Sequence, residues 1–357
     1  MQSGILLVRA DASAEMGVGH VMRCVALAEA WLKTGGRATF AMAEGVELGD
    51  RIRSRGGEIL EIQGEPGRQE DIKATRIAGQ RLGADWLVVD GYHFSPEYIA
   101  DVEKAASHFL VMADGEQYHA LNCDLLVNPE LDVSEDEYPS SDRCGGILLG
   151  PRYALLRREF LDYSVGNKTF PQSAARVLVT LGGGDAHNVT LRVMNALDKI
   201  TDRQLDVVIV LGAANPHRTT LEFAAANSRH KMELISDAPN MPKLMAEAMF
   251  AVTAGGGTCY ELAFMRVPML LITIARNQER AVDAYNRAGI GLSAGRFQDF
   301  DETLFVGILR RMISDSGLRQ RLSANAARMI DGKGAERIVS EMLSISASAN
   351  KLTGTRR

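Results

Sequence analysis

The sequence predicts an α/β protein made of two units, each with a parallel sheet. Three observations carry this prediction. Short apolar runs of strand length alternate with segments of helical periodicity. That pattern is interrupted by a polar stretch and then starts again. The chain has 357 residues, which is enough for two units with separate hydrophobic cores.

The expected strands are apolar runs bounded by polar or glycine-containing turns. In the first half they cover residues 5–8, 38–42, 86–89, 109–112, 125–127 and 147–149. In the second half they cover residues 177–181, 206–211, 233–235, 250–253 and 269–273. The polar stretch at residues 166–172 is the expected linker. We therefore expect a first domain over residues 1–165, a second over residues 166–345 with a helix through Met342, and a flexible tail over residues 346–357.

Composition limits the classes of partner and compartment. A formal net charge of −5 argues against a general nucleic-acid or anionic-membrane surface. The four cysteines are scattered without a C-x-x-C pair, which indicates reduced thiols: Cys24, Cys123, Cys144 and Cys259. We find no signal-peptide pattern and no run of roughly 18 to 20 apolar residues. We expect a soluble cytoplasmic protein that binds no nucleic acid and has no stable membrane insertion, and the sequence does not predict its oligomeric state.

The histidines do not predict a metal site. Six of them show no H-E-x-x-H or similar ligand spacing: His93, His108, His119, His187, His217 and His230. We therefore expect no metal and no cofactor.

Three glycine-rich turns follow expected strands. Glycine permits a positive φ and lets a ligand approach the backbone, and a helix that starts there offers unpaired N–H groups. An anionic ligand, most often a phosphate, suits such turns. Their candidate residues are Gly17 and Gly19 in EMGVGH; Gly182, Gly183, Gly184, Asp185 and Asn188 in LGGGDAHN; and Gly255, Gly256, Gly257, Thr258 and Glu261 in TAGGGTCYE.

Two common nucleotide motifs do not fit these turns. A dinucleotide fingerprint, G-x-G-x-x-G, requires glycine where Met22 stands. No G-x-x-x-x-G-K-[ST] motif is present. The sequence therefore argues against an NAD-binding turn and against a P-loop.

His20 is the candidate base. A histidine at a helix start can simply be solvated or bonded within its turn. Its position favours chemistry, because the helix dipole and Arg23 on the same face disfavour the imidazolium form and leave a ring that can accept a proton. Asp11, at the end of the first strand, can orient that ring, contact substrate or bind nearby backbone N–H groups.

Other polar residues at strand ends are further candidates, and for some of them the sequence leaves two roles open. Asp90 and Tyr92 follow an apolar strand, where Asp90 either faces substrate or forms a turn with glycine. The neutral amides of Asn277 and Gln278 suit sugar hydroxyls. Glu261 either completes a capping box with Thr258 or accepts hydrogen bonds from ribose hydroxyls.

An ordered set of motifs supports a resemblance. RADASAEMGVGHVMRCVALA, LLGPRYALLRREF, LVTLGGGDAHNVT, TAGGGTCYELAFMRVPMLL, the NQ pair and IDGKGAERIV run nearly end to end. Together they resemble the UDP-sugar hydrolases of pseudaminic acid biosynthesis. That family lies within a wider group of GT-B glycosyltransferase-like proteins, which also contains spore-coat polysaccharide proteins.

The resemblance implies a fold and an activity. The fold is GT-B-like, with two Rossmann-like domains whose parallel sheets face each other across a cleft. The activity is metal-independent hydrolysis of a UDP-linked diacetamido-trideoxy sugar, a UDP-2,4-diacetamido-2,4,6-trideoxy-altropyranose, which releases UDP and the free sugar with inversion. His20 matches the family's proposed base.

The resemblance also assigns the remaining candidates. The first domain would hold the sugar and water, with Asn277 and Gln278 also on the sugar. The second would hold UDP, with its glycine turns at the diphosphate, Glu261 on the ribose and the loop at residues 236–241, including Met241, at the uracil. Two other classes stay open: a GT-B glycosyltransferase with an unknown acceptor, and a nucleotide-sugar-binding protein without chemistry.

Overall fold

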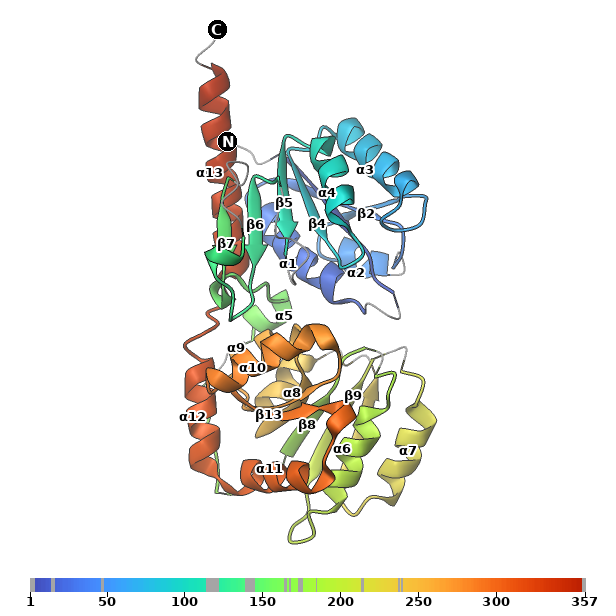
Figure 1. Ribbon diagram of the computed structural model, residues 1–357, viewed down its shortest axis with the longest axis vertical. Helices are drawn as coiled ribbons and strands as arrows, with labels where there is room; N and C mark the ends of the chain where they lie inside the picture. The colour runs from blue at the N-terminus through green and yellow to red at the C-terminus, as the bar shows by residue number, and fades with distance from the viewer. Residues whose placement is uncertain are drawn as a thin grey trace. The chain divides into compact units, whose positions relative to one another are not determined.

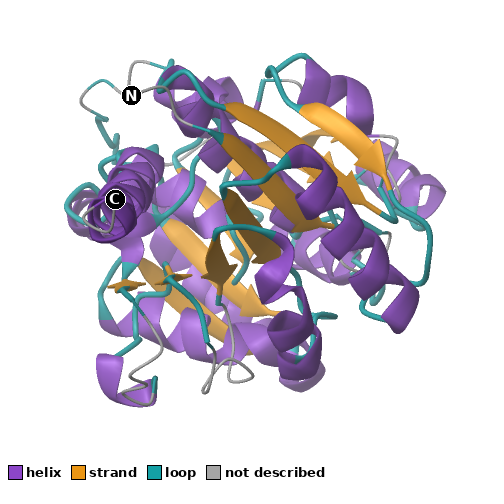
Figure 2. Ribbon diagram, turned by 90° about the horizontal axis from the view of Figure 1, so that it is seen from above, coloured by secondary structure: helices purple, strands orange, loops and turns teal. Residues whose placement is uncertain are grey.

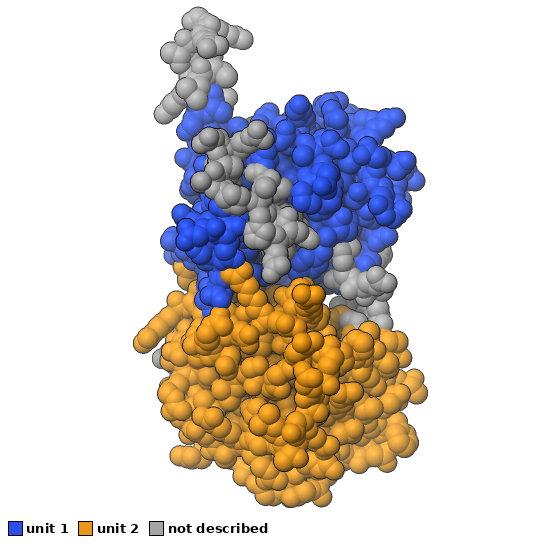
Figure 3. Space-filling model, in the orientation of Figure 1, with its two compact units in different colours: residues 1–157, 332–357 blue, residues 158–331 orange. Residues whose placement is uncertain are grey.

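The chain divides into two compact units. The computed structural model describes residues 4–13, 17–45, 48–113, 122–138, 145–163, 166, 168–172, 176–183, 185–212, 215–236, 238 and 240–354. Unit 1 comprises Met1–Arg157 and Gly332–Arg357, and unit 2 comprises Arg158–Asp331 (Figure 3). Each unit contains a parallel sheet with helices on both faces (Figures 1 and 2).

Unit 1 contains a seven-stranded sheet in the order β3-β2-β1-β4-β5-β6-β7. Its strands are β1 (Ile5–Ala10), β2 (Arg37–Met42), β3 (Glu58–Glu61), β4 (Trp86–Asp90), β5 (His108–Met112), β6 (Leu125–Asn128) and β7 (Ile147–Leu149). Its helices are α1 (Gly19–Lys33), α2 (Gly49–Arg53), α3 (Gln69–Leu82), α4 (Pro96–Val102) and α13 (Gly334–Gly354). Short 3-10 helices are η2 (Glu103–Ala105), η4 (Glu135–Glu137) and η5 (Pro151–Tyr153).

Unit 2 repeats the pattern with six strands in the order β10-β9-β8-β11-β12-β13. The strands are β8 (Arg176–Thr180), β9 (Asp206–Leu211), β10 (Lys231–Ser236), β11 (Phe250–Ala254), β12 (Met269–Thr273) and β13 (Gly291–Arg296). The helices are α5 (Arg158–Leu161), α6 (Val189–Asp198), α7 (Arg218–Asn227), α8 (Met241–Glu247), α9 (Thr258–Phe264), α10 (Glu279–Arg287), α11 (Glu302–Ser314) and α12 (Ser316–Ala326). Its 3-10 helices are η6 (Arg276–Gln278) and η7 (Phe297–Asp299).

Burial on both faces explains the continuous apolar strands. In β1, Leu6 and Val8 pack in one cluster with α1 and α13, whereas Leu7 packs in a second cluster on the opposite face. Successive side chains of a strand point to opposite faces, so a strand covered on both sides needs apolar residues at every position. The predicted α/β class and the two parallel sheets are therefore confirmed.

The strand order places the glycine turns at equivalent points of the two sheets. In each sheet the chain order reverses between the first strand and its neighbour, at β1/β4 in unit 1 and at β8/β11 in unit 2. Ligands of open α/β sheets bind beyond the carboxyl ends of the strands at such a reversal. All three glycine turns directly follow β1, β8 or β11. The fold thus brings most of the candidate residues to two topological switch points.

Two strands were missing from the sequence prediction, and both lie at sheet edges. β3, with the sequence EILE, leaves its outer residues exposed, and β13, with the sequence GLSAGR, carries two glycines and is half-buried. An edge strand needs fewer apolar residues because one side lacks a neighbour. The periodicity argument therefore misses strands of this kind.

The predicted domain boundaries differ from the observed units. The first unit ends at Arg157, not at residue 165, and the chain returns to it at Gly332. A Cβ on Gly334 would lie 2.2 Å from the Ala154 carbonyl oxygen, so α13 starts in close contact with unit 1. Ile338, Val339 and Met342 are buried in the unit 1 core, and Trp86 Nε1 donates to Ser346 Oγ at 2.9 Å. The helix continues to Gly354, so residues 346–354 of the predicted tail are helical, and their flexibility stays a prediction.

Within the described ranges, none of the helices has the length and apolar character needed to cross a membrane.

The assignment of α13 to unit 1 predicts a site-specific loss of stability. Both tryptophans of the chain, Trp31 and Trp86, lie in the same core cluster as Ile338, so tryptophan fluorescence reports on unit 1. We expect Ile338→Ala to lower the free energy of unfolding by about 3 kcal/mol, because it leaves a cavity in a close-packed core. The measurement is urea unfolding followed by fluorescence, with exposed Glu341→Ala as control. An unchanged fluorescence midpoint would contradict the assignment.

Candidate functional site

The turn before α1 is built around glycine. Gly17 has a φ of +72°, and its N–H donates to the Ser13 carbonyl at 2.8 Å. Val18, the N-cap residue, has no polar side chain, so it cannot accept a bond from the first turn of the helix. A Cβ on Gly19 would meet nothing within 4 Å among the described atoms, so packing does not require glycine there. A ligand that approaches this turn needs open space beside the backbone and backbone N–H groups that can donate to it.

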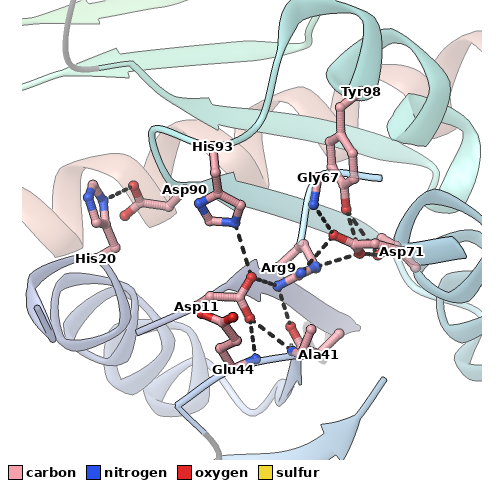
Figure 4. Close-up of polar contacts among 12 residues, drawn as sticks. Arg9, Asp11, His20, Ala41, Glu44, Gly67, Asp71, Asp90, His93 and Tyr98 are labelled. Carbon is pink, nitrogen blue, oxygen red and sulfur yellow. Dashed lines mark hydrogen bonds and ion pairs between the residues drawn. The ribbon is translucent and has the colours of Figure 1, made fainter. Parts of the chain in front are cut away.

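His20 and Arg23 converge on one carboxylate, that of Asp90 at the end of β4. Figure 4 shows the contact between His20 and Asp90. His20 Nδ1 lies 2.8 Å from Asp90 Oδ1, and Arg23 donates through Nε to Oδ2 at 2.6 Å and through Nη2 to Oδ1 at 2.5 Å. The buried thiol of Cys24 donates to Oδ2 at 3.3 Å. Asp90 is 1% exposed and His20 is 5% exposed, so this group of side chains is largely shielded from water.

The charge of Asp90 determines the tautomer of His20. Burial alone would raise the pKa of Asp90, but the Arg23 guanidinium and the His20 ring outweigh it and hold that pKa well below its usual range. The carboxylate is therefore ionised and can only accept, so Nδ1 of His20 carries the proton that it donates. Nε2 keeps its lone pair and has no hydrogen-bond partner among the described residues. A lone pair on Nε2 is what a general base requires.

Tyr92 covers one side of this ring. Its ring centroid lies 4.6 Å from that of His20, with an interplanar angle of 87°, which is an edge-to-face contact. Tyr92 is nevertheless 43% exposed. It can therefore contact His20 and present its remaining surface to a ligand, as its predicted role in substrate binding requires.

The structure gives Asp90 a contact that the sequence analysis did not consider, and it supports one of the three roles considered for Asp11. The oxygens of Asp90 accept from protein side chains, which makes it an orienting group for His20 and not a residue that faces substrate. Asp11 is fully buried and does not orient His20. Its Oδ1 accepts from the N–H groups of Ala43 and Glu44, at 2.8 and 2.9 Å. Of the three roles considered for Asp11, the contact with backbone N–H groups is the one that the geometry supports.

A second buried network lies beside the first, and the sequence analysis missed it (Figure 4). Arg9 donates to Asp71 through Nε at 2.8 Å and Nη2 at 2.7 Å, and its Nη1 lies 2.6 Å from Asp11 Oδ2. Tyr98 Oη donates to Asp71 Oδ1 at 2.9 Å, and His93 Nε2 lies 3.1 Å from Asp11 Oδ2. The one available signal was Arg9 itself, because an arginine within an apolar strand must be paired.

This network fixes the charge of Asp11. Burial alone would raise the pKa of Asp11, but its bond to His93, the nearby Arg9 guanidinium and two backbone N–H groups together lower it. An ionised Asp11 ties the end of β1 to the loop after β2. The loops that follow β1, β2 and β4 are thereby joined by buried hydrogen bonds.

In unit 2, the turn after β8 closes on its own helix. Asp185, 7% exposed, accepts from the N–H groups of Val189 and Thr190 at 2.8 and 2.9 Å, so its carboxylate occupies the start of α6. Asp185 and Asn188 both have left-handed backbone, with φ values of 40° and 50°. Gly182, with a φ of 90°, retains open space at its Cβ position among the described atoms.

The backbone of Gly183 packs against Gly212, where a Cβ would lie 2.1 Å from the Gly183 carbonyl oxygen, so this contact requires glycine at residue 212. Gly184, the third predicted glycine of this turn, and Cys144 lie outside the described residues.

The turn after β11 does not form the capping box considered for Thr258 and Glu261. The N-cap of α9 is Gly257, which has no side chain, and Thr258 is the first residue of the helix. Cβ atoms on Gly256 and Gly257 would meet nothing within 4 Å among the described atoms, whereas one on Gly255 would lie 2.6 Å from Val282 Cγ2. Gly255 is thus required by packing, and the next two glycines leave the helix start open.

The remaining candidates of unit 2 lie on two other turns. Gln278 Oε1 accepts from the Ile274 N–H at 3.1 Å and so stabilises the turn after β12, while Asn277 is exposed. Met241 is the first residue of α8 and is 8% exposed, so it packs mainly inside unit 2. Residues 237 and 239 of its loop lie outside the described part of the chain.

Among the described residues, no group of three or more His, Cys, Asp or Glu side chains is arranged to hold a metal ion.

Comparisons with known proteins show similarity to glycosyltransferase-like proteins. Residues 176–288 match the model of the glycosyltransferase family 28 C-terminal domain. The chain is 24% identical over 335 residues to the spore coat polysaccharide biosynthesis protein SpsG of Bacillus subtilis, covering 92% of this chain and 95% of that protein. It is 24% identical over 280 residues to a UDP-2,4-diacetamido-2,4,6-trideoxy-beta-L-altropyranose hydrolase of Campylobacter jejuni, covering 77% of this chain and 93% of that protein.

Solved structures with a similar arrangement of helices and strands identify the fold. MurG of Acinetobacter baumannii superposes with a TM-score of 0.67 at 10% identity, over 96% of this chain and 99% of that one. The calicheamicin glycosyltransferase CalG4 gives 0.66 at 15% identity, over 96% and 98%. Two parallel-sheet units with this topology define a protein of the GT-B glycosyltransferase-like fold. Within that fold, the chain is similar in sequence to SpsG and to the altropyranose hydrolase over most of its length.

The buried Asp90 pair predicts a pH-dependent stability difference. Because the folded-state pKa of Asp90 is lowered, its pair contributes stability that is present above the unfolded pKa of about 3.9 and lost as pH falls through the folded pKa. We expect Asp90→Asn to cost about 3 kcal/mol at pH 7, because it leaves Arg23 without its carboxylate, and to cost less at pH 3.5. Urea unfolding at both pH values measures this. A cost that stays constant or grows toward low pH would contradict the assignment.

Proposed function

We propose that the protein is a nucleotide-sugar hydrolase. Its substrate is a UDP-linked diacetamido-trideoxy sugar, which water cleaves at the anomeric carbon to UDP and free sugar. The observation that carries the proposal is the buried Asp90–His20 pair, which leaves Nε2 of His20 with a lone pair. The relationship to the Campylobacter hydrolase supports the choice of substrate. The similarity to SpsG, a spore coat polysaccharide biosynthesis protein, supports a role for this chain in the synthesis of surface polysaccharide.

The reaction follows from the state of His20. Nε2 removes a proton from water while the water oxygen forms a bond to the anomeric carbon. The bond from that carbon to the diphosphate oxygen breaks, and its electron pair leaves with UDP. Water attacks from the face opposite the leaving group, so the configuration at this carbon inverts. Asp90 then accepts hydrogen bonds from an imidazolium, and its negative charge stabilises the proton that the ring has gained.

The sugar contacts belong to the surface around His20. Gly17 and Gly19 leave their backbone accessible, and Tyr92 presents an exposed ring. Asp90 orients the His20 ring through its hydrogen bond to Nδ1, and Arg23 holds Asp90 in place. Asn277 remains a proposed sugar contact because its amide is exposed, and Gln278 contributes through the turn that it stabilises.

The nucleotide contacts belong to unit 2. Asp185 already occupies the start of α6, so we assign the diphosphate mainly to the open backbone at Gly256, Gly257 and Thr258. In place of the capping box, the proposed role of Glu261 is to bind the ribose hydroxyls. Gly182 and Met241 stay in the proposal as neighbours of the phosphate and the uracil.

A glycosyltransferase is the second candidate. The match of residues 176–288 to a glycosyltransferase family 28 domain and the superposition with MurG favour it. The same base would then remove a proton from an acceptor hydroxyl instead of from water. The two functions separate cleanly, because a hydrolase releases UDP when no acceptor is present.

The hydrolase proposal predicts acceptor-free release of UDP and a strict need for His20. Purified protein is incubated with UDP-2,4-diacetamido-2,4,6-trideoxy-β-L-altropyranose alone, and UDP and reducing sugar are followed. We expect equal amounts of both, and we expect His20→Ala to lower kcat by roughly 10²- to 10⁴-fold because the general base is lost.

His108→Ala is the matched control for His20→Ala, since His108 is the first residue of β5 and so lies at the amino ends of the strands, away from the carboxyl ends that carry the candidate site. UDP release only after an acceptor is added would favour the transferase. Binding without release would favour a protein without chemistry, and near-normal turnover by His20→Ala would refute the base assignment.

The ribose assignment predicts a loss of UDP affinity on changing Glu261. Glu261→Gln should raise the Kd for UDP about tenfold, because charged hydrogen bonds to the hydroxyls are replaced by weaker neutral ones. Titration calorimetry with UDP measures this, and Glu302→Gln, an exposed glutamate at the start of α11, is the control. Equal Kd values for native protein and Glu261→Gln would remove Glu261 from the site.

A further inference from the structure

Two histidine–aspartate pairs lie at the carboxyl ends of neighbouring strands, and they cross. His20 follows β1 and bonds to Asp90 at the end of β4, whereas His93 follows β4 and lies 3.1 Å from Asp11, which follows β1. The hydrolysis proposed above uses the first pair and gives the second no task. The second pair is nonetheless built from buried and half-buried groups, which are costly to place without a partner.

The His93 ring is tightly enclosed. A Cβ on Gly91 would lie 2.7 Å from its Cε1 and 3.0 Å from its Nδ1, and its centroid is 3.9 Å from that of Phe94. The side chain is 20% exposed, and Nδ1 is buried without a hydrogen-bond partner in the described part of the chain. The bond from Nε2 to Asp11 is therefore the polar contact that orients this ring.

The Asp11 end of this bond is rigid. Oδ1 is held by the N–H groups of Ala43 and Glu44, and Oδ2 lies 2.6 Å from Arg9 Nη1. His93 thus fastens the turn that follows β4 to a carboxylate anchored on β1 and on the loop after β2 (Figure 4). The same turn carries Asp90 and Tyr92, which both contact the His20 ring; Arg23 of α1 also contacts it, with Nη2 3.2 Å from Nδ1.

We propose that His93 is a positioning residue: its Nε2–Asp11 bond fastens the turn at residues 90–93 and so holds Asp90 and Tyr92 in contact with His20. The effect on turnover rests on the proposed function, while the effect on the His20 ring does not. His93 contacts no reacting atom. It acts through Asp90 and Tyr92, which contact the His20 ring, and a displacement of about 1 Å there can cost roughly 100-fold in rate.

Two amide substitutions separate a positioning role from simple packing. The side-chain nitrogen of His93→Gln reaches the place of Nε2 and can donate to Asp11, whereas that of His93→Asn ends near the place of Nδ1 and cannot. Gly91→Ala is a second disruptive variant that leaves His93 in place: its Cβ would lie 2.7 Å from the His93 ring, and its φ of +158° also strains the backbone of this turn for alanine. His108→Asn serves as the control, and urea unfolding followed by tryptophan fluorescence establishes that each variant is folded.

Two readouts are measured for each variant. The first is the NMR signal of the His20 Nδ1 proton, which should be sharp and slow to exchange in native protein and in His93→Gln, and lost to exchange in His93→Asn and Gly91→Ala. The second is turnover of the UDP-sugar, where kcat should fall roughly 10- to 100-fold in His93→Asn and Gly91→Ala and recover to within about threefold of native in His93→Gln. The Kd for UDP should not change in any of them.

Retention of both the His20 signal and kcat in His93→Asn would overturn the proposal, and so would equal losses in His93→Gln and His93→Asn. If native protein releases no UDP, the proposed function fails, and the His20 signal alone then supports or overturns the positioning role.

Discussion

The buried carboxylate of Asp90 is the constraint on which the arrangement of side chains around His20 in unit 1 depends. A carboxylate that is 1% exposed loses nearly all its hydration, so it must obtain hydrogen bonds from the protein. His20 and Arg23 supply them, and both come from the first turns of α1. The requirement acts in both directions. Asp90 stays ionised because of these donors, and the donors are oriented because Asp90 is ionised.

Sheet topology makes this arrangement possible. His20 and Asp90 are 70 residues apart in sequence, yet β1 and β4 are neighbours, and Ala10 pairs with Asp90 in their register. The carboxyl ends of two adjacent parallel strands lie at the same edge of the sheet, so loops that follow them share a small space. Both crossed histidine–aspartate pairs exploit this adjacency. The Arg9–Asp71 pair extends the network to α3. One set of buried hydrogen bonds therefore joins the loops that follow β1, β2 and β4.

The sequence was informative where structure depends on local pattern. Apolar runs predicted the strands that are buried on both faces, and the glycine turns located the two switch points, because both signals lie within a few residues. The two edge strands β3 and β13 lacked that pattern. The return of α13 to unit 1 was also not predictable, since its buried residues Ile338 and Met342 show which helix face is apolar but not which core it covers. Side-chain partners such as Asp71 for Arg9 are set by tertiary contacts, to which spacing along the chain gives no access.

The two glycine turns of unit 2 are alike in sequence and differ in charge. At the start of α6, Asp185 places a carboxylate on two N–H groups, so the dipole and the donors of that helix are already used by the protein. At the start of α9, the N-cap is a glycine, and the space at Gly256 and Gly257 is open among the described atoms. A second anion at α6 would have to displace Asp185 or accept its repulsion, whereas an anion at α9 meets neither cost. Under the proposed function a diphosphate binds unit 2, and because it carries more negative charge than one carboxylate, this difference favours α9 over α6 for that role. In the turn after β8, the left-handed conformations of Asp185 and Asn188 instead determine the path of the backbone into α6.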